Sequence, residues 1–518
     1  MQSREIPVVV ICGDVGAPPV PLRPGELAAR LRRELPGVTA LLLGEICETP
    51  QALSEGLAAA RPNRVVVACR ADPQRHGELR TRLRSAGAPL AGTEIVDLKT
   101  ADGCSATVAL EQSVALVSAA VVRVAVADVT APVRERTSLS VGGVTRRSLL
   151  RGVNTARHFV AVWRPERCTT AAACTACVLA CPHGALRQQG RRVVVDGDRC
   201  TGCGACVACC RNAALVLPGA ELEGLGAAAA VLGAVARRDG SVVGVSIVCR
   251  HAEPVPLIGE AWLVLRVPSV EMVTAGWILQ LVSAGVNVRV LGCKDQDCET
   301  RASDLEGFVR ALMQALGFSE GEAAFIKAPA GRESAPTALA PWGDGIELRE
   351  PEATMQALSA LRALGPARAP WRVEGAGCSL GVVGVDPAGC SLCEVCVGVC
   401  PTGAFAAERD GGGVLHLSVD SSRCNGCGAC VTSCPEAVIS VERAADAGLL
   451  SRRGQVVATG PVVSCERCGV PLVAGPQQAV LRRRLGGSHP NLTSGSARIC
   501  ADCRLGGRSA TGSRSRVT

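Results

Sequence analysis

Two stretches of the chain carry cysteines at a spacing that binds iron-sulfur clusters. Seventeen of the 29 cysteines lie within residues 168–210 and 390–434, and sixteen of them fall into two copies of a paired motif. In the second stretch, two runs with the pattern C-x2-C-x2-C-x3-C-P begin at Cys390 and Cys424. The two-residue gaps wrap three thiolates around one [4Fe-4S] cluster, and the fourth cysteine ligates the neighbouring cluster. The residue types and their spacing therefore predict one-electron transfer chemistry.

The two stretches form an internal repeat. CTGCGACVACC from Cys200 aligns with CNGCGACVTSC from Cys424, and CTACVLAC from Cys174 aligns with CEVCVGVC from Cys393. Both resemble bacterial two-cluster ferredoxins, in which two runs exchange their fourth ligands. Four [4Fe-4S] clusters are predicted, with the ligand sets Cys168, Cys174, Cys177 and Cys210; Cys200, Cys203, Cys206 and Cys181; Cys390, Cys393, Cys396 and Cys434; and Cys424, Cys427, Cys430 and Cys400.

The first stretch departs from the regular pattern. Five residues separate Cys168 from Cys174, Arg211 stands where proline is usual, and Cys209 is an extra thiol. Cys168 is the least secure of the predicted ligands, because a longer loop must fold back to the iron. Without it, that cluster would be a three-iron form or would have an exchangeable fourth ligand.

Four further cysteines follow apolar runs near the N-terminus, and they are Cys12, Cys47, Cys69 and Cys104. In a parallel α/β sheet the carboxyl ends of the strands share one edge, where ligands bind. The four thiols could therefore converge on a metal. The alternative is that they are buried, unreactive cysteines.

The segment NRVVVACRADPQRHGELRTRLRSAGAPL resembles the N-terminal part of the flavin-carrying subunit of heterodisulfide reductase, over about residues 5–130. That resemblance implies a fifth [4Fe-4S] cluster, held by the four N-terminal cysteines. The family also has a flavin domain, but no GxGxxG fingerprint follows a strand in this sequence. We therefore expect no flavin or NAD site.

The central segment LGCKDQDCET resembles the delta subunit of methyl-viologen-reducing hydrogenase, also called the hydrogenase iron-sulfur subunit. The resemblance implies a [2Fe-2S] cluster. The cysteines that match the family are Cys249, Cys293 and Cys298. Ala252 and Ser269 replace the other expected cysteines, so His251 would be a conceivable fourth ligand. A degenerate domain that docks a redox partner is the alternative, and we favour it.

Two knuckles near the C-terminus, Cys465-x2-Cys468 and Cys500-x2-Cys503, are separated by 31 residues. Four thiolates in paired knuckles suit a tetrahedral zinc site. Iron at the same position and no metal at all are the alternatives.

The fold class we expect is multi-domain α/β and α+β. An N-terminal parallel α/β domain is followed by two ferredoxin-like 2[4Fe-4S] units that flank a second α/β domain, and a small four-cysteine module closes the chain. In the second α/β domain we expect a helix over residues 270–285. The expected boundaries are 1–130 for the N-terminal domain, 131–160 for a linker, 161–220 for the first ferredoxin unit, 221–328 for the second α/β domain, 329–377 for a linker with a helix, 378–445 for the second ferredoxin unit, 446–504 for the C-terminal module and 505–518 for a disordered basic tail.

Composition limits the location and partners that we expect. No signal peptide is recognisable, the export-like VTRRSLL at residues 144–150 lies far from the N-terminus, and no run of about 18 uninterrupted apolar residues exists. A cytoplasmic protein without a membrane span is expected. The net charge is +8, but the chain has no tyrosine and five phenylalanines, so nucleic acid is discounted as a partner.

These observations predict an electron-transfer subunit of a heterodisulfide-reductase-like or hydrogenase-linked complex. Its partners would be a flavoprotein, heterodisulfide-reductase-like subunits or hydrogenase subunits. Two alternatives stay open: a catalytic oxidoreductase that reduces a substrate at an irregular cluster, and a nonenzymatic redox-sensing scaffold.

Overall fold

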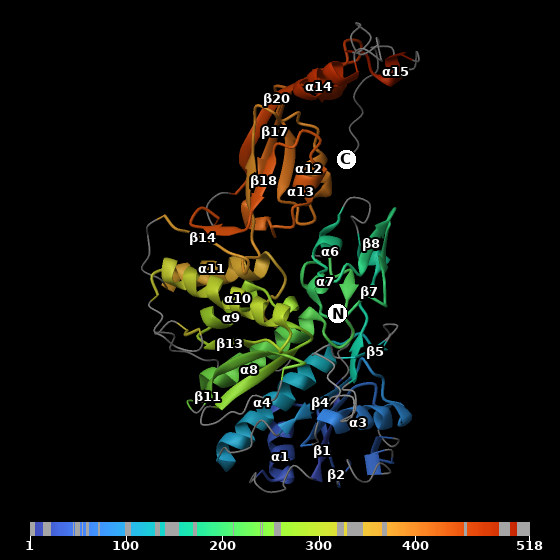
Figure 1. The fold of residues 1–518 in the computed structure, drawn as a ribbon, viewed down its shortest axis with the longest axis vertical. Helices are drawn as coiled ribbons and strands as arrows, with labels where there is room; N and C mark the ends of the chain where they lie inside the picture. The colour runs from blue at the N-terminus through green and yellow to red at the C-terminus, as the bar shows by residue number, and fades with distance from the viewer. Residues whose placement is uncertain are drawn as a thin grey trace. The chain divides into compact units, whose positions relative to one another are not determined.

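The chain is described by a computed structural model and divides into two compact parts (Figure 1). The first comprises residues 1–379 with 444–446, and the second comprises 380–443 with 447–518. Cys47, Cys104, the VTRRSLL segment and the tail 505–518 lie outside the described residues. The structure describes residues 6–13, 22–44, 46, 52–53, 55–57, 62–70, 73–98, 105–129, 135–139, 155–168, 174–210, 212–238, 240, 242–252, 261–318, 326–328, 345–364, 370–449, 453–485 and 498–504.

The N-terminal domain is a parallel four-stranded sheet in the order β2-β1-β3-β4, as predicted for this class. Every residue of β3 is buried, as are four of the five residues of β1, because helices cover both faces of such a sheet. The elements are β1 (Val8–Cys12), α1 (Pro24–Glu34), β2 (Thr39–Leu43), β3 (Val65–Cys69), α3 (Pro73–Ser85), β4 (Thr93–Asp97) and α4 (Ala106–Ala125).

Helix α4 is the most apolar long helix among the described residues. Its mean hydropathy reaches 1.6 over an 18-residue window, but 78% of that window is buried. The helix packs against α1, β3 and β4 of its own domain and against α8 of the next one. It is therefore a core helix, as its length and periodicity predict.

The first cysteine unit, residues 161–220, contains two short antiparallel strand pairs and two single-turn helices. β7 pairs with β10, and β8 pairs with β9. In the stretch expected to be a linker, β5 (Glu135–Leu139) pairs with β6 (Thr155–Phe159). The elements of the unit are β7 (Val162–Trp163), α6 (Ala176–Leu179), β8 (Leu186–Gln189), β9 (Arg192–Val195), α7 (Ala205–Ala208) and β10 (Leu215–Val216).

The second α/β domain has a parallel three-stranded sheet in the order β12-β11-β13. Its elements are α8 (Leu222–Arg238), β11 (Val242–Cys249), β12 (Ala261–Val267), α9 (Ala275–Ser283), β13 (Val288–Leu291), α10 (Gln296–Ala315) and α11 (Glu352–Leu364). The helix predicted over 270–285 begins later in the structure than the sequence pattern indicates. The Ser269 hydroxyl accepts from Glu271 N at 3.2 Å and caps a separate 3-10 turn, and Val273 has an extended backbone, so α9 begins only at Ala275.

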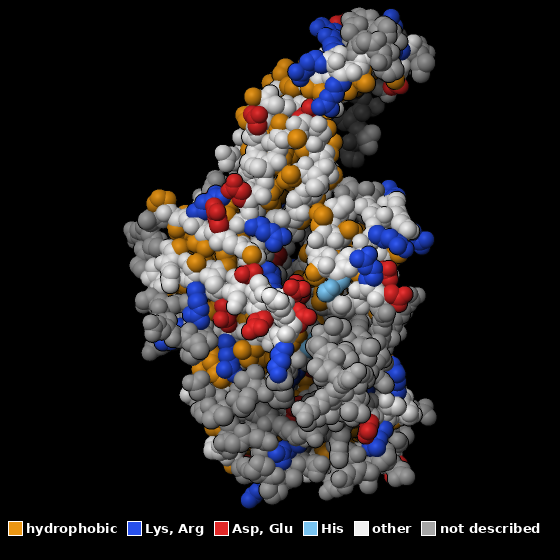
Figure 2. Space-filling model, in the orientation of Figure 1, with side chains coloured by type: hydrophobic (Ala, Val, Ile, Leu, Met, Phe, Trp, Pro, Cys, Tyr) orange, Lys and Arg blue, Asp and Glu red, His pale blue; other side chains and the backbone are white. Residues whose placement is uncertain are grey.

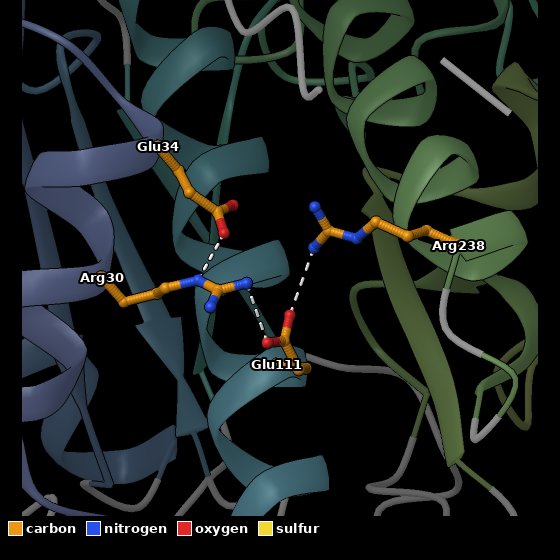
Figure 3. Close-up of polar contacts among 4 residues, drawn as sticks. All are labelled: Arg30, Glu34, Glu111 and Arg238. Carbon is orange, nitrogen blue, oxygen red and sulfur yellow. Dashed lines mark hydrogen bonds and ion pairs between the residues drawn. The ribbon is translucent and has the colours of Figure 1, made fainter. Parts of the chain in front are cut away.

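An ion-pair network joins the N-terminal domain to the second α/β domain (Figure 3). Glu111 on α4 accepts from Arg30 of α1 at 2.9 Å and from Arg238 of α8 at 3.2 Å. Arg30 also pairs with Glu34 on its own helix. Helices α4 and α8 thus meet through polar as well as apolar side chains.

The second compact part combines residues 380–443 of the second cysteine unit with the C-terminal module. β15 pairs with β18, and a separate antiparallel sheet runs β16-β17-β20-β21. Because β20 belongs to the module and β17 to the cysteine unit, one sheet links the two. The elements are β15 (Val382–Val385), α12 (Val395–Val399), β16 (Phe405–Arg409), β17 (Val414–Val419), α13 (Ala429–Ser433), β18 (Ile439–Glu442), β20 (Gln455–Ser464), β21 (Pro471–Ala474), α14 (Gly475–Leu485) and α15 (Ala501–Arg504).

Candidate iron-sulfur centres

The cysteine loops depend on backbone in the left-handed region, which glycine adopts without strain. In CTGCGAC and CNGCGAC, the glycines with positive φ are Gly202 (67°), Gly204 (86°), Gly426 (67°) and Gly428 (71°). The run from Cys390 keeps this conformation at the matching positions with Leu392 (φ 54°) and Glu394 (φ 62°). The loop shape is therefore shared even where the sequence lacks glycine.

The irregular Cys168 is close enough to Cys177 of its predicted set to influence its pKa. The pKa of Cys177 is raised to about 12, first by burial and then by the neighbouring thiols of Cys174, Cys210 and Cys168. A thiol that is buried among thiols favours its neutral form until a cation compensates the charge. This arrangement suits metal binding.

The other set of the first unit is also gathered in one place. The pKa of Cys206 is raised well above its usual range by burial, and next by Cys203, Cys200 and Cys181. Cys177 of the neighbouring set adds to the same shift, so the two sets adjoin.

The extra thiol of the first unit, Cys209, is near thiols of both sets. Its pKa is raised well above the usual range by burial, then by Cys206 and by Cys177. Its Sγ is 3.3 Å from the carbonyl oxygen of Cys206. Ser433 occupies the matching position of the second unit.

In the second unit, the first predicted set surrounds a cavity. The four thiols share its walls with apolar residues, with Ser391 and with two carboxylates. The lining residues are Val385, Cys390, Ser391, Leu392, Cys393, Glu394, Val395, Cys396, Leu417, Cys434, Pro435, Glu436, Val438 and Ile439. The pKa of Cys396 is raised to about 12 by burial, then by Cys393 and Cys390. An apolar cradle with four converging thiols fits a [4Fe-4S] cluster.

The last set is assembled in the same way. Burial, followed by the neighbouring thiols Cys427, Cys430 and Cys400, raises the pKa of Cys424 to about 12. Cys430 also contributes to the raised pKa of Cys396, so the two sets of the second unit adjoin as those of the first unit do.

The fourth cysteine of each run is predicted to ligate the neighbouring cluster. Three of these four cysteines accept the same kind of backbone hydrogen bond. Each accepts a hydrogen bond at Sγ from the amide four residues later: Ala185 N to Cys181 at 3.3 Å, Ala214 N to Cys210 at 3.3 Å and Ala404 N to Cys400 at 3.2 Å. Such bonds stabilise a thiolate and tune the potential of a bound cluster.

The sulfurs of the C-terminal module are packed more tightly than a cubane allows. Those of Cys465, Cys468, Cys500 and Cys503 all lie within 4.8 Å of one another, and Cys468 and Cys500 are 3.6 Å apart. A zinc ion with bonds of about 2.3 Å needs sulfurs about 3.8 Å apart. Among the described residues, no ferredoxin-type cysteine belongs to a group this compact. The module therefore fits a single ion.

The central domain brings its predicted residues together at the carboxyl end of β11. Ligand atoms of Cys249, His251 and Cys293 lie within 4.8 Å of one another. Cys298 Sγ accepts from Cys293 N at 3.4 Å, and its hydrogen bond with Cys249 lowers its pKa to about 5. Cys249, His251 and Cys293 thus form a compact mixed group of two thiols and one imidazole, and Cys298 is hydrogen-bonded to it.

A second contact constrains the histidine. Arg250 Nε donates to His251 Nε2 at 3.3 Å, which leaves the ring proton on Nδ1, 3.9 Å from Cys249 Sγ. In this tautomer His251 donates toward the Cys249 sulfur, and it could bind iron through Nδ1 only after losing that proton. The sequence patterns did not single out Arg250.

At the N-terminus, Cys12 and Cys69 end the adjacent parallel strands β1 and β3, and both are fully buried. The two thiols thus lie at the sheet edge where a metal site was predicted, and the convergence of all four N-terminal cysteines stays a prediction. Cys12 Sγ lies 3.8 Å from the carbonyl oxygen of Gly44, so the edge of β2 is close as well. Cys378, which no pattern assigned, is buried in the first compact part.

Comparison with protein families finds a 4Fe-4S binding domain at residues 416–439, which contain the run that begins at Cys424. A comparison with curated proteins finds no significant match. The matched segment is a small part of the chain. Together with the gathered cysteines it indicates iron-sulfur binding and electron transfer.

Proposed function

We propose that this chain is an iron-sulfur electron-transfer subunit of a heterodisulfide-reductase-like or hydrogenase-linked oxidoreductase complex. It would relay electrons through at least four [4Fe-4S] clusters, two in each cysteine unit. The observation that supports the proposal is the proximity of thiols within the predicted sets and between the two sets of each unit. A pair of adjoining centres suits transfer better than a single isolated site.

The clusters would supply one-electron storage, and the residues of the chain would hold and insulate them. Burial of Cys177, Cys206, Cys396 and Cys424 keeps water away from the sulfurs. The amide hydrogen bonds to the fourth cysteines of the runs would stabilise the thiolates. Both features affect the reduction potential, which spans roughly −700 to +450 mV for such centres.

Two further sites extend the proposal. Cys12 and Cys69 lie where a fifth [4Fe-4S] cluster would be held, and the compact group of the central domain could hold a [2Fe-2S] cluster or serve as a docking point. Within the first compact part, Arg250 links that central group to the loop of Cys200. A redox partner such as a flavoprotein or hydrogenase subunit would then exchange electrons with the chain through the central domain.

Anaerobic purification followed by iron and sulfide analysis tests this function. Four cubanes predict about 16 iron atoms per chain, rising to about 20 with an N-terminal cluster. Dithionite reduction should give EPR signals of interacting [4Fe-4S] pairs. Iron and sulfide near eight per chain would contradict the assignment of two two-cluster units.

One observation favours a second function, reduction of a substrate at the irregular cluster. Cys209 adds a fifth thiol near Cys177 and Cys206, and it could exchange with a ligand when a substrate binds. EPR spectra of the reduced protein that change on addition of a disulfide substrate, and no longer change in Cys209→Ser, would support catalysis. Unchanged spectra would favour electron transfer alone.

A further inference from the structure

The C-terminal module contacts the second cysteine unit at the candidate centre formed by Cys390, Cys393, Cys396 and Cys434. Arg484, near the end of α14, donates through Nη2 to Glu436 Oε2 at 2.7 Å and to the Pro435 carbonyl at 3.4 Å. Pro435 and Glu436 directly follow Cys434 and line the same cavity as the four thiols. A guanidinium of the module therefore lies against the loop of this candidate centre.

A second contact fixes the other end of the same helix. A side chain at Gly460 on β20 would lie 2.8 Å from Leu392 and 3.0 Å from Pro476. Leu392 belongs to the cysteine loop, and Pro476 is in the first turn of α14. Because a Cβ at this one position would crowd both residues, Gly460 lets the cysteine loop and the first turn of α14 approach the strand closely. Helix α14 therefore has a contact near each end.

Packing alone holds α14 weakly. None of its side chains is fully buried, and its last turn carries the basic residues Arg482, Arg483 and Arg484. Figure 2 shows basic side chains, all of them arginines in this part of the sequence, gathered over this helix. The thiol pairs flank it in sequence: Cys468 precedes it by seven residues and Cys500 follows it. An ion bound to both knuckles would close the loop that contains α14.

The knuckles are already arranged as a metal site. The Cys500 amide donates to Cys465 Sγ at 3.3 Å, and the Cys503 amide donates to Cys500 Sγ at 3.4 Å. Arg467 of the first knuckle donates to the Cys503 carbonyl of the second at 3.0 Å. Amide hydrogen bonds to thiolates are the outer contacts that orient ligands in thiolate metal sites.

We propose that the four C-terminal cysteines bind one zinc ion, and that this ion holds Arg484 beside Glu436 and thereby sets the reduction potential of the adjoining cluster. This inference rests on the proposed function, because it requires a cluster on Cys390, Cys393, Cys396 and Cys434. Reduction adds one negative charge to that cluster. The Arg484 cation stabilises the added charge, whereas the Glu436 carboxylate opposes it.

Arg484→Gln removes a positive charge and should lower the equilibrium constant for reduction of this cluster two- to tenfold, where tenfold equals 59 mV for one electron. Glu436→Gln removes a negative charge and should raise the constant by a similar factor. Arg483→Gln is the matched control, since it removes the same charge from the neighbouring exposed position of α14.

The experiment uses the full chain, purified anaerobically, with zinc, iron and sulfide measured on the same sample. Potentiometric titration monitored by EPR gives the potentials, and the signal lost in Cys393→Ser identifies the cluster. A Cys468→Ser/Cys500→Ser variant should contain no zinc and should show the same downward shift as Arg484→Gln. Adding Arg484→Gln to that variant should cause no further shift.

Each outcome separates the two proposals. One zinc per chain with the expected opposite shifts supports the inference. Three results would overturn it: a zinc-free variant with the wild-type potential, equal shifts in Arg484→Gln and Arg483→Gln, or iron bound in place of zinc. If iron is still near 16 per chain in such a case, the proposed function stands. If Cys393→Ser instead loses no EPR signal, the result contradicts the proposed function.

Discussion

The guanidinium of Arg250 donates a hydrogen bond to the carbonyl oxygen of Thr201, 3.2 Å away. Thr201 directly follows Cys200 in the first cysteine unit, and Arg250 directly follows Cys249 in the central group. The same guanidinium donates to His251. Burial lowers the pKa of Arg250, whereas the nearby Cys249, Cys203 and Cys200 thiols raise it. One cation is therefore shared by two candidate centres.

Arg250→Gln should lower the reduction potential of the cluster on Cys200, Cys203, Cys206 and Cys181, because it removes a positive charge near those thiolates. We expect an effect of about tenfold in the reduction equilibrium, or about 59 mV. Redox titration followed by EPR measures it. Arg187→Gln, at an exposed position of β8 in the same unit, is the control and should shift the potential much less. An equal shift in both variants would contradict a specific role for Arg250.

Glu111→Gln should loosen the contact between α4 and α8 without affecting the cysteines. Its carboxylate pairs with Arg30 and Arg238, and all three side chains are partly exposed, at 19%, 26% and 33%. Partly exposed pairs of this kind are worth about 1 kcal/mol in total. Thermal unfolding at low salt should show the loss, and the difference from wild type should shrink in 1 M salt because salt screens the pairs.

Glu78→Gln removes an equivalent charge from an exposed position of α3 and serves as the control. It should leave the unfolding temperature within error of wild type. A salt-independent loss in Glu111→Gln would show that packing rather than charge was disturbed.

The sequence could predict the features that repeat or alternate locally. The parallel strands could be predicted from apolar β-branched runs. The internal repeat, which aligns Cys424 with Cys200, predicted related cysteine loops. The predicted start of α9 was wrong. The apolar periodicity continues through residues 270–274, but the cap at Ser269 and the extended backbone of Val273 separate a 3-10 turn from the helix. The contacts of Arg250 with Thr201 and of Arg484 with Glu436 could not be predicted, since each joins residues about 50 positions apart through a flexible side chain.

The glycines at one position of the repeat should respond differently to substitution. Gly428→Ala places a Cβ in open space at φ +71° and should cost about 1 kcal/mol from backbone strain alone. Gly204→Ala adds a Cβ that would lie 2.6 Å from Met272 Sδ, so Met272 of the second α/β domain must move as well. This overpacking adds about 1–3 kcal/mol.

The temperature at which the visible absorbance of the clusters is lost on heating measures the effect of both glycine substitutions. The first unit of Gly204→Ala should lose its clusters at a clearly lower temperature than the second unit of Gly428→Ala. Equal losses would mean that the contact with Met272 does not constrain the loop.

Cys12→Ser and Cys69→Ser test the N-terminal site. If a [4Fe-4S] cluster is held at the carboxyl edge of β1 and β3, the double variant should lose about four iron atoms per chain. The EPR signals of the clusters proposed for the two cysteine units should be unchanged. Cys378→Ser, at another buried cysteine, is the control and should keep its full iron content. An unchanged iron count in the double variant would identify Cys12 and Cys69 as core residues.

Zinc retention by the C-terminal module should depend more steeply on pH below about 6. The Cys500 amide that donates to Cys465 is the main reason why the pKa of Cys465 is lowered to about 6. Above that pH Cys465 is already a thiolate and binds zinc without releasing a proton. Below it the thiol is protonated, so zinc must displace one more proton and its affinity falls faster as pH decreases.

Burial and neighbouring thiols raise the pKa of Cys503 to about 12, so that residue must release a proton at any physiological pH. Competition with a chromophoric chelator between pH 5 and 8 should therefore show the slope of log affinity against pH steepening by about one proton near pH 6. A constant slope across this range would show that Cys465 does not provide a preformed thiolate.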